Sequence, residues 1–215
     1  TAEAAAPGRY GSLAGKLPWS KSEAHWTVEE FQEPGEHLLE AMADAVTTNQ
    51  SRLIDAVLAP THLVRDAEDP WLRVDVDAFP RFRRAIDERQ GQRIDIDYLL
   101  IATFSLFQDR NWRRQVIAAI EPLPFRNLWL RIGDFGAGEE RRVPELLDIM
   151  KEFDGLGRPI VLDMAGGLAG VAMLAAGGAN AIAHGAGSQE KCDLKTWLKE
   201  PKKGGGRSEE HTSEL

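Results

Sequence analysis

The sequence predicts an α/β protein whose parallel strands form an incomplete (β/α)8 barrel, with an open, doubly wound parallel sheet as the alternative. Five apolar segments of strand length alternate with segments in which apolar residues recur at helical spacing. The strand segments are apolar on both faces, as expected when helices cover a sheet or when the sheet closes into a barrel. Because five strand–helix units are visible, we expect a complete barrel to need about three more units upstream.

The predicted strands are the apolar stretches that lie between glycine- and proline-containing turns. They are Leu53–Leu63, a strand within Ile94–Phe107, Asn127–Ile132, Pro159–Leu162 and Asn180–Ala183.

The predicted helices carry apolar residues three or four positions apart, and several of them end at glycine or proline. Gly91 ends the helix that contains Phe79, Phe82 and Ile86, and Pro122 follows the helix that starts near Trp112. The apolar stripes are Leu38–Leu39–Met42–Val46, Phe79–Phe82–Ile86, Trp112–Val116–Ile117–Ile120, Val143–Leu146–Leu147–Met150–Phe153 and the short helix Leu168–Ala176. We expect Trp112 and Trp129 to pack in the core and Trp71, which follows Pro70, to cover a loop.

Three regions are predicted along the chain. Residues 1–34 read as an irregular N-terminal segment, residues 35–200 as the barrel-like domain, and residues 201–215 as a disordered tail. The last nine residues, Arg207–Leu215 (RSEEHTSEL), resemble a translated sequencing adapter, so we expect them to be an artefact. Because the first residue is Thr1 rather than Met, we expect the chain to be a fragment of a longer protein.

Composition excludes several classes of function. The net charge of −8 argues against a strong electrostatic interaction with nucleic acid or with an anionic membrane. We find no apolar run of about 18 residues, so no transmembrane helix is predicted. The chain has a single cysteine, Cys192, which rules out an internal disulfide and favours a reducing cytoplasm.

Polar side chains follow nearly every predicted strand. In a barrel these strand ends meet at one rim, which is where barrel enzymes carry out their chemistry. Asp95 and Asp97 lie at the other end of their strand and are expected to face solvent, and Asp109 reads as the start of a helix. The candidate site residues are His62, Arg131, Asp134, Asp163 and His184, with Ser105, Gln108 and Asp109 at the exit of the second strand.

The segment Pro159–Ser188 contains two strand ends that are each followed by a glycine-rich turn. This order resembles the last two units of the phosphate-binding (β/α)8-barrel superfamily. In that superfamily backbone N–H groups of the turns and a short helix N-terminus hold a phosphate. The resemblance implies that four glycines contact a phosphate or cofactor here: Gly166, Gly167, Gly185 and Gly187.

Three functions remain open from the sequence. The first is an enzyme that acts on a small anionic ligand, phosphorylated or nucleotide-like, with Asp163 or His184 as general acid or base and Arg131 paired with the anion. The second is a metal-dependent hydrolase with His62, Asp163 and His184 as ligands. The third is a barrel-like binding protein without turnover. No motif specifies the reaction, the cofactor or the oligomeric state.

Overall fold

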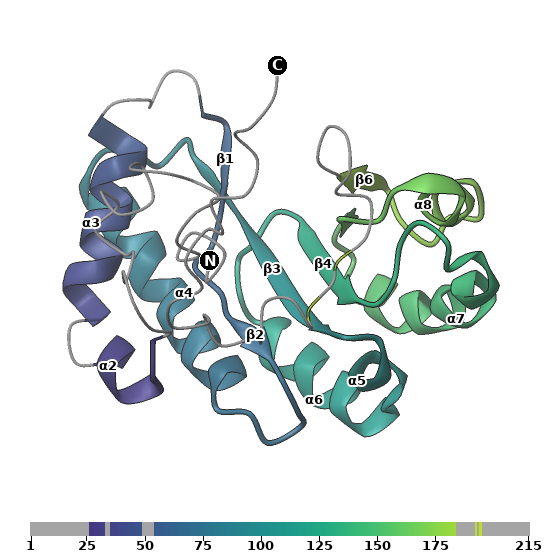
Figure 1. The fold of residues 1–215 in the computed structure, drawn as a ribbon. Helices are drawn as coiled ribbons and strands as arrows, with labels where there is room; N and C mark the ends of the chain where they lie inside the picture. The colour runs from purple at the N-terminus through teal and green to yellow at the C-terminus, as the bar shows by residue number, and fades with distance from the viewer. Residues whose placement is uncertain (1–25, 33–34, 49–53, 184–191, 193, 195–215) are drawn as a thin grey trace, which may run out of the picture.

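The strands of this protein form one curled parallel sheet. A computed structural model of the chain describes residues 26–32, 35–48, 54–183, 192 and 194. In this part the strand order is β1-β3-β4-β5-β6, with β2 also paired with β3, and every pairing is parallel. The sheet curves into a half-barrel (Figure 1), which confirms the predicted α/β class and the barrel-like curvature. The strands are β1 (Ala56–Leu58), β2 (Leu63–Val64), β3 (Asp95–Thr103), β4 (Leu128–Gly133), β5 (Ile160–Asp163) and β6 (Ala181–Ala183).

The first predicted strand, Leu53–Leu63, is divided into two pieces. β1 pairs with the start of β3 and β2 with its end, so the two pieces occupy the same position at the edge of the sheet. Pro60 lies between them, and proline has no N–H to give to a ladder. The residues between β1 and β2 are therefore not part of a strand.

The helices lie along the outer, convex side of the sheet (Figure 1). Asp109 caps α6, because its side chain accepts hydrogen bonds from the backbone N–H groups of Asn111 and Trp112, as the sequence predicted. One expectation needs correction, because Val28–Gln32 is helical within the segment expected to be irregular. Ser105 and Gln108 follow the end of β3 as expected, in a short helix that begins directly after the strand. The helices are α2 (Val28–Gln32), α3 (Gly35–Thr48), α4 (Trp71–Glu88), α5 (Phe104–Gln108), α6 (Arg110–Ile120), α7 (Val143–Asp154) and α8 (Gly167–Ala175), with a 3₁₀ turn η2 at Glu140–Arg142.

Alternate residues of each strand point to opposite faces of the sheet. On β4, Leu128, Leu130 and Ile132 belong to the main core between the sheet and the helices, whereas Trp129 packs with the separate cluster on the concave face. Trp112 is fully buried, as predicted. Trp71 is instead the first residue of α4 and is buried there, because its ring stacks on a histidine of the β1–β2 connection.

None of the helices in the described ranges combines the length and the apolar character that crossing a membrane requires.

Candidate functional site

An ion pair between Arg131 and Asp163 joins β4 to β5 on the concave face of the half-barrel. Arg131 and Asp163 are register partners on the two strands. The guanidinium Nε donates a hydrogen bond to Asp163 Oδ2 at 2.7 Å, and Nη2 lies 2.6 Å from the same oxygen in the ion pair. The two side chains are only 11% and 10% exposed. Asp163 is the last residue of β5, and Arg131 is two residues before the end of β4. The pair therefore lies at the carboxyl edge of the sheet, where the sequence predicted it.

The backbone turns sharply directly after both of these strands. Asp134 follows β4 with φ +62°, and Met164 follows β5 with φ +56°, a region that side-chain-bearing residues seldom adopt. Asp134 contributes backbone groups here, because its carbonyl accepts a 2.7 Å hydrogen bond from Arg142 Nη1. Its own side chain is half-buried. The structure thus places Asp134 at the same edge as the ion pair.

The glycine turn after β5 leads into α8 at this same edge. Gly166 is the N-cap residue of α8 and is extended, with no side-chain cap, and Gly167 starts the helix with φ +65°. Gly170 is needed for packing, since a Cβ there would lie 2.1 Å from the carbonyl oxygen of Ala165. The N-terminus of α8 therefore has no side-chain cap, and its free N–H groups favour the binding of negative charge. It also lies only a few residues along the chain from Asp163.

His62 is placed in a different environment from the ion pair. It lies between β1 and β2, and its ring stacks on Trp71 with centroids 3.7 Å apart and meets Phe31 edge-on. Its Nδ1 lies 2.6 Å from Asp75 Oδ1, while its backbone N–H donates to Asp75 Oδ2 at 2.7 Å. These partners come from α2 and α4 on the helix side of the sheet, so His62 is not brought to Arg131 and Asp163.

Asp75, the hydrogen-bond partner of His62, was not predicted from the sequence as a site residue. Its side chain is almost completely buried, and burial raises the pKa of Asp75, while the hydrogen bonds from His62 act in the opposite direction. A signal was present in the sequence, because Asp75 lies four residues from both Trp71 and Phe79 on the buried stripe of α4. A carboxylate on the apolar face of a helix requires a partner.

Asp97 was expected to face solvent, and that expectation is wrong. It is 4% exposed on the concave face and accepts hydrogen bonds from Asn127 N (3.0 Å), Asn127 Nδ2 (3.0 Å) and Trp129 Nε1 (2.8 Å). Asp95, two residues earlier, is exposed as expected and pairs with Arg126 at 2.8 Å. The donors to Asp97 come from β4 and from the residue before it, about 30 positions further along the chain, so only the fold could reveal them.

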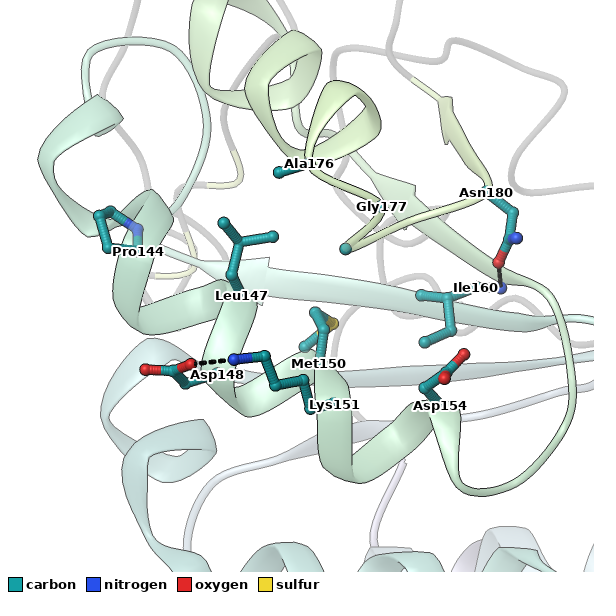
Figure 2. Close-up of a pocket in the computed structure, with 11 residues that line it drawn as sticks. Pro144, Leu147, Asp148, Met150, Lys151, Asp154, Ile160, Ala176, Gly177 and Asn180 are labelled. Carbon is teal, nitrogen blue, oxygen red and sulfur yellow. Dashed lines mark hydrogen bonds and ion pairs between the residues drawn. The ribbon is translucent and has the colours of Figure 1, made fainter.

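A groove of about 540 Å³ opens between α7 and α8 (Figure 2). It reaches Ile160 and Asn180, at the amino ends of β5 and β6, and so lies at the edge opposite the ion pair. Three charged residues line it, and all are exposed: Asp148 and Lys151 bond to each other at 2.6 Å, and Asp154 is the third. Asn180 Oδ1 accepts a hydrogen bond from Ile160 N. The charged groups of this groove are exposed, and the groove lies at the amino edge rather than at the carboxyl edge of the strands, so it is not the better candidate site.

Three of the predicted site residues, His184, Gly185 and Gly187, lie outside the described residues. Across the residues that are described, no three His, Cys, Asp or Glu side chains are grouped so that they could hold a metal ion. The hypothesis of a metal site made by His62, Asp163 and His184 therefore gains no support from the position of His62.

Comparison with protein-family models, with curated proteins and with solved structures found no match to this chain. What the structure defines is a class: a parallel α/β half-barrel with a buried Arg–Asp pair at the carboxyl edge of its sheet. At that edge the chain can offer a guanidinium for an anion, a carboxylate for proton transfer and the N-terminal N–H groups of α8.

Proposed function

We propose that this protein is a barrel-type enzyme that binds a small anionic molecule, phosphorylated or nucleotide-like, at the carboxyl ends of β4 and β5. The observation that supports the proposal is the Arg131–Asp163 pair, which lies at this edge with both side chains about nine-tenths buried. Burying two charges costs desolvation energy that hydrophobic residues of similar size would not cost. A ligand-binding role is a reason for the pair to lie at the edge where parallel barrels carry out their chemistry.

Each group has a distinct part in this proposal. Arg131 pairs with the anionic group of the ligand, and Asp163 holds the guanidinium in place through Oδ2. We assign proton exchange with the ligand to the carboxylate of Asp163, which is the last residue of β5. Gly166 and Gly167 lead into the helix N-terminus that favours a phosphate.

The finer parts of the proposal come from the sequence. We propose that the half-barrel is part of a (β/α)8 barrel, that His184 is the further acid or base, and that Gly185 and Gly187 complete the phosphate site. Asp134 is proposed as a rim residue because it follows β4 at the same edge.

The proposal is tested by replacing Arg131 with lysine, which keeps the charge but cannot donate from two nitrogens in a fixed plane. Thermal unfolding is measured with and without adenosine monophosphate or inorganic phosphate. A ligand at about 100 times its dissociation constant should stabilise the wild-type protein by about 2.7 kcal/mol. The shift should be lost in Arg131→Lys.

Arg126→Lys is the matched control, because Arg126 is exposed and pairs with Asp95 at the amino edge of the same sheet. This variant should keep the full ligand-dependent shift. Equal shifts in the wild-type protein and in Arg131→Lys would remove Arg131 from the site, and the absence of any shift with either anion in the wild-type protein would count against the proposed ligand class.

A further inference from the structure

A second pair of ionisable side chains, His62 and Asp75, lies apart from the Arg131–Asp163 pair. His62 is in the connection between β1 and β2, and Asp75 is in α4 on the helix side of the sheet. The side chain of Asp75 is 2% exposed and that of His62 is 17% exposed. A buried carboxylate bonded to a partly accessible imidazole is a combination that transfers protons in enzymes.

Asp75 determines which nitrogen of His62 carries the proton. Asp75 Oδ2 accepts the backbone N–H of His62 at 2.7 Å, and Asp75 Oδ1 lies 2.6 Å from Nδ1 of the ring. An ionised carboxylate has no hydrogen to donate, so Nδ1 carries the proton in this hydrogen bond. In the neutral imidazole the other nitrogen, Nε2, then has a lone pair and is the atom that can accept a proton.

Nε2 lies on the accessible part of the His62 ring. Trp71 stacks on the ring with centroids 3.7 Å apart and planes 16° from parallel, and Phe31 meets it edge-on at 4.8 Å. Within the described part of the chain no residue forms a hydrogen bond with Nε2, and Nε2 is not one of the buried polar atoms that lack a partner. The exposed part of the side chain therefore includes Nε2, whereas Asp75, Trp71 and Phe31 hold the rest of the ring.

We propose that His62 is a general base at a second site, on the helix side of the sheet, which activates water against small carboxylic esters. Nε2 takes a proton from water while the water oxygen bonds to the ester carbonyl carbon. The bond between that carbon and the leaving oxygen then breaks, the leaving oxygen keeps the electron pair, and Nε2 returns the proton to it. Ester and water give acid and alcohol, and His62 ends in its starting state. This site is separate from the proposed anion site and does not depend on it.

Asp75 is a positioning residue in this reaction, because it acts through His62. When Nε2 holds the transferred proton the imidazole is positively charged, and the carboxylate beside Nδ1 stabilises that charge. The contacts with Trp71 and Phe31 fix the ring, so its orientation is set before a substrate arrives. Because only 17% of the His62 side chain is exposed, the site favours water and small substrates.

Hydrolysis of para-nitrophenyl acetate by the full-length protein tests the proposal, with release of nitrophenolate followed by absorbance in mildly alkaline buffer. His62→Asn is the informative variant, because its side-chain amide can still donate to Asp75 while Nε2 is absent. The protein-catalysed rate should fall at least about tenfold, since general-base catalysis contributes about 10²–10⁴-fold. Circular dichroism checks that the variant keeps the wild-type fold.

Two variants serve as controls. His37 of α3 is 89% exposed and lies 3.7 Å from the exposed Glu40, so His37→Asn removes an imidazole that no buried carboxylate holds. This variant should keep the wild-type rate. Arg131→Lys should also keep it, because the ester site is separate from the anion site. Equal rates in the wild-type protein and in His62→Asn would overturn the inference, whatever the result of the anion-binding experiment.

Nitrogen NMR of the imidazole tests the geometry without a substrate, because the chemical shifts of Nδ1 and Nε2 show which nitrogen is protonated. Neutral His62 of the wild-type protein should carry its proton on Nδ1. In Asp75→Asn the amide oxygen accepts the backbone N–H of His62 and the amide N–H faces Nδ1. The ring proton should then move to Nε2, and the ester rate should fall at least about tenfold. A proton on Nε2 in the wild-type protein, or a wild-type rate in Asp75→Asn, would contradict the proposal.

Discussion

At the scale of single residues, two aspartates on the same face of β3 have opposite environments. Asp97 is buried and accepts hydrogen bonds from Asn127 and Trp129, whereas Asp95 is half-exposed and pairs with Arg126 on the surface. An ionised carboxylate only accepts hydrogen bonds, so an amide in place of Asp97 turns an N–H group towards one of these donors.

Asp97→Asn should therefore lower the free energy of unfolding by about 2 kcal/mol, measured by urea denaturation at neutral pH. Asp95→Asn is the matched control, and it should change stability by less than about 0.5 kcal/mol because exposed ion pairs contribute little. Equal effects of the two substitutions would show that the hydrogen bonds to Asp97 do not matter for stability.

A second residue-scale consequence concerns pH. Burial raises the pKa of Asp75 above its ordinary value of 3.8, while His62 lowers it and Asp69 raises it further. The folded protein therefore holds a proton on Asp75 more readily than the unfolded chain does. This group contributes stability below pH 3.8, and the contribution is lost as the pH rises through the raised pKa.

Asp75→Asn removes this titration. The free energy of unfolding of the variant minus that of the wild-type protein should increase as the pH rises from about 4 towards neutral. Urea denaturation at several pH values measures this difference. Asp77→Asn, which changes an exposed aspartate on the same helix, should give a difference that does not vary with pH. A decrease with pH for Asp75→Asn would contradict the assignment of burial as the main cause.

At the scale of elements, Arg113 of α6 links three helices. Its side chain is 8% exposed, and its Nη1 donates to the carbonyl oxygens of Phe107 and Gln108 at the end of α5. Its Nε and Nη2 donate to Glu152 of α7 at 3.0 and 2.7 Å. These hydrogen bonds lower the pKa of Glu152, so the stability that this pair contributes is present above pH 4.5 and is lost as the pH falls through the lowered pKa.

Arg113→Lys keeps the charge, but a single ammonium group cannot reach both the α5 carbonyls and the α7 carboxylate. We expect a loss of about 2–4 kcal/mol in the free energy of unfolding at neutral pH, measured by urea denaturation. Arg114→Lys at the neighbouring exposed position should be within about 0.5 kcal/mol of the wild-type protein. A neutral Arg113→Lys would mean that the three helices are held without this side chain.

At the scale of the whole molecule, the regular parts of the fold were predictable from the sequence. Helical and strand periodicity is local, so the strands β3 to β6 and the helices α4, α6, α7 and α8 were all foreseen, and with them the curved parallel sheet. The position of Arg131 and Asp163 at one edge of the sheet was also predictable, because the carboxyl ends of parallel strands lie at the same edge. The break between β1 and β2 was not foreseen, although Pro60 was a signal for it.

The contacts that were missed are those between distant parts of the chain. Asp97 was assigned to solvent because its donors on Asn127 and Trp129 become neighbours only when β3 and β4 pair. His62 was predicted to lie with the other polar residues at the strand ends. Its position in the sequence does not show whether its ring points to the helices or to the concave face of the sheet. Periodicity predicts which residues are buried, but it does not predict which polar groups meet.

Because every strand runs in the same direction, the connections between helices and strands alternate between two edges of the sheet. The turn after α7 lies at the amino edge, away from Arg131 and Asp163. Gly157 in this turn is exposed, has φ +63°, and would have open space around a Cβ. Such turns accept inserted residues with little loss of folding. An affinity tag, a fluorescent reporter or a new chain terminus created by permutation can therefore be introduced at Gly157 without approaching Arg131 and Asp163 at the opposite edge.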